Sequence, residues 1–156
     1  MSGRRSFSRF LVVHRRIKRL FRAHQLALIS LDLRKAKRLL EQFEWELLDH
    51  IRVEEQYLLP IYRRAGDIPG GPEIFFTGEH RALRRFIANF KQIIRRYSVR
   101  QGDIRKGVLA ILDREAMFKG LLHHHDLRER NILYPALDRV ATEAERRQFL
   151  SERGGA

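Results

Sequence analysis

Two stretches of the sequence repeat the same residue types at the same spacing. Segments 50–60 and 125–135 agree at His, at Glu four places later, at Leu eight places later and at Pro ten places later. On a helix, residues four apart lie on one face with Cβ atoms about 5–6 Å apart. His50 therefore lies beside Glu54, and His125 beside Glu129. Each pair offers an imidazole and a carboxylate, which are the donors of a nitrogen- and oxygen-ligated metal site.

A metal ion explains these pairs better than simple burial does. A single histidine on an apolar helix face usually bonds a carbonyl or another side chain. A buried carboxylate without a partner, however, costs several kcal/mol, and this sequence predicts two of them next to two imidazoles. A divalent cation removes all these penalties together, because ligating carboxylates are ionised and ligating imidazoles are neutral.

Long helices must position these residues. Four segments, at about 10–31, 40–61, 76–97 and 104–136, carry apolar residues alternately three and four apart, the spacing of a helix-bundle seam. Candidate caps, glycines or prolines interrupt the pattern at 30–32, 65–72 and 98–103. Because such short connections make neighbours antiparallel, we expect an all-α protein folded as an up-down-up-down four-helix bundle.

One domain accounts for the whole sequence. A chain of 156 residues is an ordinary domain length, so we expect a single domain over 1–156 with its core at about 8–140. Pro60 and Pro135 occupy equivalent places and should kink or end their helices. Beyond Val140 the sequence is polar, and we expect this tail to be frayed or to lie on the surface.

Height along the predicted bundle selects the histidine of the first helix. If the first turn centres near Leu31, His14 lies 17 residues before it and His50 lies 19 residues after it. Antiparallel packing then brings these two histidines to nearly the same height. His24 lies only 7 residues before the turn, which places it about 10 Å away along the axis at about 1.5 Å per residue. We therefore predict that His14, and not His24, is the metal ligand from the first helix.

In the second half of the chain, two more histidines are predicted to lie at one height along the bundle. With a turn near Gln101, His80 lies 21 residues before it and His125 lies 24 after it. Six side chains share the predicted layer, too many for one tetrahedral zinc ion. Mixed imidazole and carboxylate donors suit two iron ions bridged by the carboxylates, with manganese or zinc as less favoured occupants. The predicted ligands are His14, His50, Glu54, His80, His125 and Glu129.

At these residues the chain resembles the hemerythrin-like, or HHE cation-binding, family over about residues 10–140. The paired His-x-x-x-Glu with its trailing proline carries the resemblance. It implies a non-haem di-iron centre with an oxo or hydroxo bridge, able to meet dioxygen, hydrogen peroxide or nitric oxide. Oxygen-carrying members have a second histidine four places from the one on the third helix, where this chain has Phe76 and Arg84 around His80. The four-His, two-Glu set is more similar to the bacterial iron-cluster-repair and stress-response branch.

Some nearby residues have more than one interpretation. Tyr57 follows Glu54 by one turn, where it is either a core filler or an additional ligand. Of the histidines that flank His125, at least one should be exposed, and His124 is the first candidate for a replacement fifth ligand. Glu55 points away from Glu54 and is expected to support a ligand or to lie on the surface. Two further inward-facing residues, His24 and Glu115, are expected to hydrogen-bond to each other.

Composition excludes several classes of function. The absence of cysteine rules out disulfides, iron–sulfur clusters and thiolate zinc sites. The net charge of +13 is spread over every predicted helix, which is typical of a solvated surface and does not favour nucleic acid as a partner. No stretch is long and apolar enough to span a membrane, so we expect a cytoplasmic protein. Its oligomeric state is not predicted.

Three functions are compatible with these observations. The leading hypothesis is a di-iron protein that binds or reduces a small oxidant, as part of an oxidative or nitrosative stress response. The alternative is a non-enzymatic module that senses or stores iron or oxygen. The third is a metal-free basic interaction protein whose inward polar residues are structural. Metal content separates the third hypothesis from the others, and oxidant consumption separates the first from the second.

Overall fold

The computed structural model describes residues 6–99 and 103–151, and these residues contain helices but no strand. The all-α prediction is therefore confirmed. Among the described residues, no helix combines the length and apolar character needed to cross a membrane. The four long helices are α1 (Leu11–Ile29), α2 (Leu33–Val53), α4 (Glu73–Val99) and α5 (Ile104–Arg128). The shorter elements are η1 (Phe7–Phe10), η2 (Glu54–Leu58), α3 (Leu59–Tyr62), η3 (Arg63–Ala65), η4 (Glu129–Leu133), α6 (Tyr134–Val140) and α7 (Glu143–Ser151).

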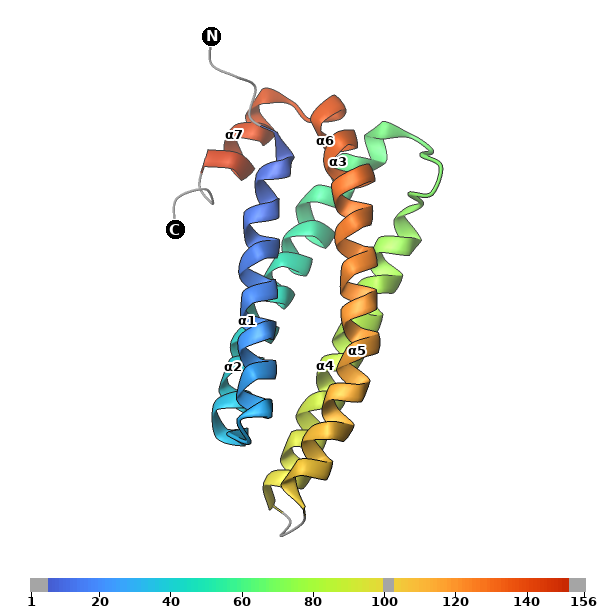
Figure 1. The fold of residues 1–156 in the computed structure, drawn as a ribbon. Helices are drawn as coiled ribbons and strands as arrows, with labels where there is room; N and C mark the ends of the chain where they lie inside the picture. The colour runs from blue at the N-terminus through green and yellow to red at the C-terminus, as the bar shows by residue number, and fades with distance from the viewer. Residues whose placement is uncertain (1–5, 100–102, 152–156) are drawn as a thin grey trace.

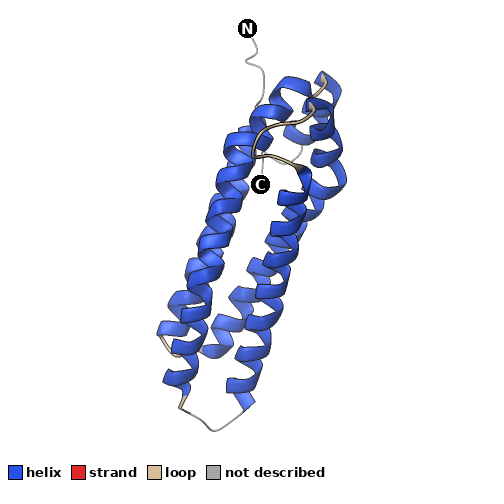
Figure 2. Cartoon of the chain, turned by 90° about the vertical axis from the view of Figure 1, so that its right-hand side faces the viewer, coloured by secondary structure: helices blue, strands red, loops and turns tan. Residues whose placement is uncertain are grey.

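The long helices lie side by side, and the short ones gather at one end (Figure 1). In that view α1 runs toward the lower end and α2 returns from it. Turned by 90°, the molecule shows an elongated helical body with a long loop at the end opposite the α1–α2 turn (Figure 2). Phe21, Phe43 and Phe118 pack together near the middle of the core, with ring centroids 5.0–5.8 Å apart.

Local sequence signals set the turn between α1 and α2. Leu31 adopts a left-handed backbone with φ of 58°, which ends the regular path of α1. The Asp32 side chain then accepts a hydrogen bond of 2.9 Å from the Lys35 amide and caps α2. This is the turn that the height argument assumed.

At the start of α5, Asp103 plays the same capping role by accepting a hydrogen bond from the Arg105 amide. Only glycine fits at position 107, because its Cα faces the ring of Tyr97. An added Cβ would lie 2.7 Å from that ring. Of the predicted turn at 98–103, residues 100–102 lie outside the described residues.

Both prolines follow a widened helical turn. After α2, the π turn η2 carries a backbone hydrogen bond from the Leu59 amide to the Glu54 carbonyl. The turn η4 repeats this with a bond from the Tyr134 amide to the Glu129 carbonyl. Helix continues beyond each turn as α3 and α6, with Pro60 and Pro135 in the second position. The prolines neither end nor sharply break the helical path, because the extra residue accommodates the missing proline N–H.

The C-terminal segment packs more firmly than the sequence predicted. Residues 143–151 form α7, and Leu150 on it is 3% exposed. The Arg9 guanidinium donates a hydrogen bond of 3.3 Å to the Leu150 carbonyl and ties this helix to η1. Phe149 packs against Tyr57 with ring centroids 5.5 Å apart. Of the two expectations for this tail, the helix α7 is not frayed but lies on the surface, where its apolar residues cover the end of the helical body.

Candidate metal centre

The two His-Glu pairs face each other from α2 and α5. His50 Nε2 lies 3.4 Å from Glu54 Oε1, and His125 Nε2 lies 2.6 Å from Glu129 Oε1. The pairs also approach each other, with 3.6 Å between His50 Nε2 and Glu129 Oε2. All four side chains are almost completely shielded from solvent. The repeated spacing thus places both pairs at one buried point.

His14 joins them from α1. Its Nε2 lies 3.0 Å from His50 Nε2 and 2.8 Å from Glu129 Oε2. His24 is held elsewhere in the core, where its Nε2 lies 2.6 Å from Glu115 Oε1 and its Nδ1 donates to the Ala36 carbonyl. The height argument therefore selected the histidine that reaches the pairs, and His24 and Glu115 bond to each other as expected.

His80 joins from α4. Its Nε2 lies 3.2 Å from Glu54 Oε2. Its ring stands edge-on to the ring of His125, with centroids 4.8 Å apart. The residue four places before it, Phe76, is fully buried among apolar side chains, and Arg84 four places after it bonds Glu55. Helix α4 consequently supplies a single imidazole.

The converging donor atoms form two overlapping clusters. Within each cluster, the candidate ligand atoms lie within 4.8 Å of one another. Glu129 belongs to both clusters, so one carboxylate connects them. The structure brings together all six residues predicted from the sequence. One cluster contains His14, His50 and Glu129, and the other contains Glu54, His80, His125 and Glu129.

The π turns change which residues follow the ligands on the inner face. In an α-helix residue i+4 stacks over residue i, whereas in a π turn residue i+5 takes that place. Leu59, five residues after Glu54, therefore takes this place and is buried, while Tyr57 is 42% exposed and packs on Phe149. The proposal of Tyr57 as an additional ligand or as a seam filler is wrong, because it assumed uninterrupted α-helical phase.

Tyr134 occupies the place that the second π turn creates. It lies five residues after Glu129, and its hydroxyl is 3.2 Å from Glu129 Oε2 and 2.9 Å from His14 Nε2. Only 1% of the residue is exposed. Sequence reasoning missed Tyr134 for the same reason that it misplaced Tyr57. The available signal was Pro135, which marks the point where α-helical phase fails.

His123 and His124 both lie on the exposed side of α5. Their rings neighbour each other, with centroids 6.2 Å apart. The suggestion that His124 replaces a missing fifth histidine is wrong, because one residue along an α-helix turns the side chain by about 100° from His125.

Carboxylates orient three of the four imidazoles. His14 Nδ1 bonds Asp126, His80 Nδ1 lies 2.9 Å from Glu55 Oε1, and His125 Nδ1 lies 3.0 Å from Glu79 Oε2. Each carboxylate also bonds a cation, which fixes its own position. These contacts leave the Nε2 atoms directed at the cluster, the arrangement that supports metal-ligating histidines. The three chains of contacts are Lys18–Asp126–His14, Arg84–Glu55–His80 and Arg128–Glu79–His125.

The orienting carboxylates share a simple sequence position. Glu55, Glu79 and Asp126 each stand directly beside a candidate ligand in the chain, yet each supports an imidazole on a different helix. A residue next to an inward-facing ligand points sideways along the helix, toward the neighbouring helix. The sequence allowed this role for Glu55, whereas Glu79 and Asp126 were not identified.

Unsatisfied buried atoms show that the cluster fits a cation. Among the described residues, Glu54 Oε1, Glu129 Oε1 and His125 Nε2 are buried and make no hydrogen bond of suitable geometry, even though the last two atoms lie 2.6 Å apart. Leaving such groups unpaired costs about 1–3 kcal/mol each, and more for charged ones. All three atoms belong to the cluster that Glu54 and His80 help to form. A bound metal ion satisfies them at once.

The pKa values of the buried donors also depart from their ordinary values, because burial and neighbouring charges act on them in opposite directions. Burial raises the pKa of Glu54 to about 8, and the nearby Glu129 carboxylate adds to the rise. For His14, burial opposes the charged form, yet Glu129 and Asp126 raise the pKa to about 9. Burial lowers the pKa of His80 to about 4. Metal ligation replaces this mixture of protonated and deprotonated groups with ionised carboxylates and neutral imidazoles.

Comparison with known proteins shows that the segment containing these residues matches one family model. A family model described as the hemerythrin HHE cation binding domain matches residues 7–137. The match includes both His-Glu pairs as well as His14, His80 and Tyr134. No curated protein and no solved structure matched the chain.

Proposed function

The chain belongs to the hemerythrin HHE cation-binding family, and we propose that it is a non-haem di-iron protein that binds or reduces a small oxidant. The oxidants are dioxygen, hydrogen peroxide or nitric oxide. In this proposal the four long helices act as an up-down-up-down antiparallel bundle around the centre. The overlap of two donor clusters at Glu129 carries the proposal, since a single ion would need only one of them.

The donor set favours iron. It consists of four imidazole nitrogens and two carboxylates, without sulfur. This mixture suits iron better than calcium or magnesium, which take oxygen ligands, and it exceeds the four ligands of structural zinc. His14 and His50 would hold one ion, and His80 and His125 the other. Glu54 and Glu129 would serve both, because Glu129 belongs to both clusters and the Glu54 oxygens face His50 and His80 separately.

Bound iron would supply the electrons that an oxidant accepts. The protein supplies a hydrogen-bond donor at a defined atom, the hydroxyl of Tyr134. Burial and the neighbouring Glu129 raise the pKa of Tyr134 well above its ordinary value. The phenol therefore keeps its proton at neutral pH and can donate a hydrogen bond to a ligand.

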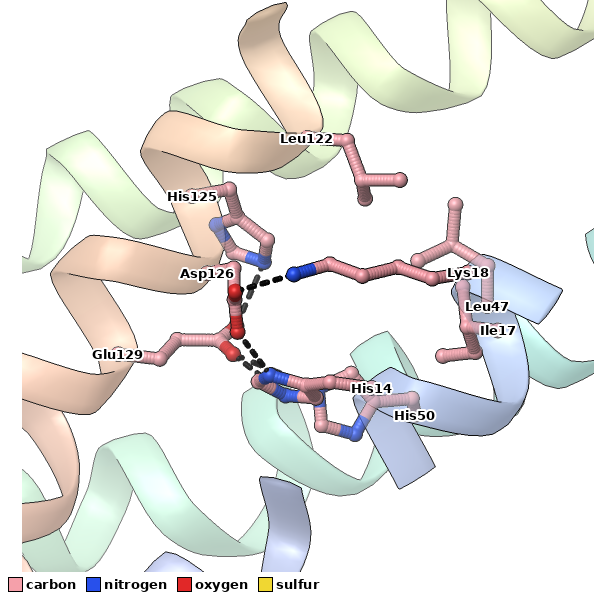
Figure 3. A pocket seen from close by; sticks show the side chains of 9 residues that line it. All are labelled: His14, Ile17, Lys18, Leu47, His50, Leu122, His125, Asp126 and Glu129. Carbon is pink, nitrogen blue, oxygen red and sulfur yellow. Dashed lines mark hydrogen bonds and ion pairs between the residues drawn. The ribbon is translucent and has the colours of Figure 1, made fainter. Parts of the chain in front are cut away.

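The surroundings of the donors restrict water. The cavity beside the cluster has a volume of about 20 Å³ and includes Ile17, Leu47 and Leu122 in its lining (Figure 3). A water molecule needs about 10–15 Å³ by this measure. The space therefore suits a ligand of one or two heavy atoms. Dioxygen, hydrogen peroxide and nitric oxide all fit this limit.

Four imidazoles for two irons leave coordination positions for such a ligand. Helix α4 contributes only His80, since Phe76 is apolar and Arg84 bonds Glu55. Open positions permit reaction with an incoming oxidant. This arrangement favours turnover over the protected, reversible oxygen binding of a carrier.

Metal analysis and oxidant consumption together test the proposal. Protein produced with sufficient iron should contain about two iron ions per chain, and the reduced protein should oxidise rapidly in air. It should also consume hydrogen peroxide or bind nitric oxide, and His125→Ala should abolish both reactions. One iron or fewer would refute the di-iron assignment. Full iron occupancy with no reaction toward the three oxidants would instead support iron sensing or storage.

A further inference from the structure

A basic groove runs over the surface beside the candidate centre, between α1 and α5. Its volume is about 490 Å³, and its lining includes Lys18, Arg22, Gln25, Lys119, Leu122 and His123. Within the part of the chain that the structure describes, the groove lining contains no carboxylate. Three permanent cations therefore face one small space, where an anion would be attracted from solution.

Helical spacing concentrates these cations on two facing surfaces. On α1, Lys18, Arg22 and Gln25 follow one another at four and three residues and so share one side of the helix. On α5, Lys119 and His123 are four residues apart and face them. Neither Arg22 nor Lys119 makes an ion pair with a carboxylate in the described residues, so their charge is available to a ligand.

The groove connects with the cavity at the donor cluster. Lys18 and Leu122 line both spaces. Figure 3 shows the Lys18 side chain extending across the cavity toward Asp126. Its Nζ lies 2.5 Å from Asp126 Oδ2, and the other oxygen of this carboxylate bonds His14 Nδ1. Lys18 thus stands at the junction between the groove and a side chain that orients a candidate ligand.

We infer that this groove is the access route to the centre and that it selects small anions, with Arg22 and Lys119 attracting them and Lys18 closing the route. An anion in the groove competes with Asp126 for the Lys18 ammonium. When Lys18 turns toward the anion, the junction between groove and cavity opens. The side chain of Lys18 is 44% exposed and has room for this movement. The inference rests on the proposed function, and it names the class of ligand that reaches the site most rapidly.

Association kinetics with azide, a three-atom anion, test the route. Azide would be mixed rapidly with the iron-loaded full chain and followed by visible absorption. Measurements at about 0.01 M and about 1 M ionic strength compare weak and strong screening, with Debye lengths of about 30 Å and 3 Å. The double variant Arg22→Gln with Lys119→Gln should bind azide about tenfold more slowly at low ionic strength. At high ionic strength the two proteins should differ by less than about twofold, since salt screens the lost charges.

Two controls separate steering from structural damage. Arg105→Gln combined with Lys106→Gln removes an equal charge from the exposed surface of α5, 13 and 14 residues from Lys119, and should leave the azide rate unchanged. Nitric oxide is neutral, so its association with the double variant should match that with the unaltered protein. Lys18→Met, which cannot bond Asp126, should admit nitric oxide severalfold faster, whereas Lys18→Arg should not.

A second measurement does not depend on iron. Azide titrated into the metal-free protein should cause saturable NMR shifts of backbone amides at 18–25 and 119–123, and the double variant should lose them. Unchanged azide rates in an iron-loaded double variant would overturn the access route while leaving the di-iron proposal intact. Failure to bind iron would refute the di-iron proposal, and the NMR titration would still decide the groove. The absence of saturable shifts would refute the anion site in either case.

Discussion

Removing the carboxylate of Glu79 should weaken the metal centre without removing a ligand. Glu79 Oε2 accepts a hydrogen bond of 3.0 Å from His125 Nδ1, and its other oxygen accepts one of 3.0 Å from Arg128 Nε. Burial raises the pKa of Glu79, but these two partners bring it below its ordinary value. The side chain is therefore an ionised acceptor that fixes the ring of His125 and increases the basicity of its Nε2.

The expected loss of metal affinity follows from the hydrogen-bond acceptor of His125 that Glu79→Ala removes. Loss of such a partner typically lowers metal affinity by about 10–100-fold, which corresponds to about 1.4–2.7 kcal/mol. The loss should affect mainly one of the two ions, because His125 belongs to only one donor cluster. Glu79→Gln keeps an oxygen acceptor without the charge and should fall between the alanine variant and the unaltered protein.

Competition with a chelator of known affinity measures this change. Each protein would be loaded with iron and titrated, and its far-ultraviolet circular dichroism would confirm that it remains helical. Glu73→Ala is the matched control on the same helix, since Glu73 pairs with Arg63 at the surface and does not contact the centre. If Glu79→Ala and Glu73→Ala released iron at the same chelator concentration, the orienting role of Glu79 would be refuted.

Three further tests, which use five substitutions, address the helix phase, the ligand assignment and the role of Tyr134. Glu54→Ala should lose at least one metal ion, whereas Glu55→Ala should keep both with reduced affinity; equal stoichiometry by metal analysis would contradict the assignment. His14→Ala should reduce iron binding. By contrast, His24→Ala should retain iron but lower the free energy of unfolding by about 3 kcal/mol, because the buried Glu115 carboxylate keeps only its hydrogen bond from Gln25; denaturant titration measures that loss. Tyr134→Phe should keep both metal ions and slow peroxide consumption, and an unchanged rate would exclude a hydrogen bond from the hydroxyl to the oxidant.

The long helices and their inner faces could be predicted because their spacing is regular. His14, Phe21 and Leu28 are all buried as the seven-residue pattern requires. The turn near Leu31 then placed His14 and His50 at one height, since every α-helical residue advances the chain by the same rise. Two periodic properties, face and height, were sufficient to bring the ligand residues together.

The residues beyond each ligand glutamate could not be placed by the same rule. A single π turn adds one residue and rotates everything that follows relative to an α-helix. Tyr57 moves to the surface, and Tyr134 moves to the centre. Apolar pattern alone does not reveal the change, because Leu58 and Leu59 are both buried and fit either phase.

The contribution of α7 was also missed. Its sequence is mostly polar: Phe149 and Leu150 supply its apolar contacts, and the buried Arg146 lies over the ring of Phe7. Such a short segment has too few apolar residues to show helical periodicity. Its position depends on tertiary contacts, among them the hydrogen bond from Arg9 to the Leu150 carbonyl.

The repeated motif is symmetric in its ligands but not in the residues that support them. Five residues after Glu54 stands Leu59, whereas five residues after Glu129 stands Tyr134, so only the second copy brings a hydroxyl to the centre. The hydroxyl lies 2.9 Å from His14 Nε2, which places this hydrogen-bond donor beside His14.

The access route reaches that same half. Lys18, which separates the groove from the cavity, bonds the carboxylate that orients His14. A ligand that passes Lys18 would therefore meet the His14 half first, where Tyr134 can donate a hydrogen bond. The first copy has the buried side chain of Ile51 where the second has Asp126, so it lacks the carboxylate that links Lys18 to His14. In the proposed centre, the asymmetry between the copies would place both ligand access and hydrogen-bond donation by Tyr134 at the ion held by His14 and His50.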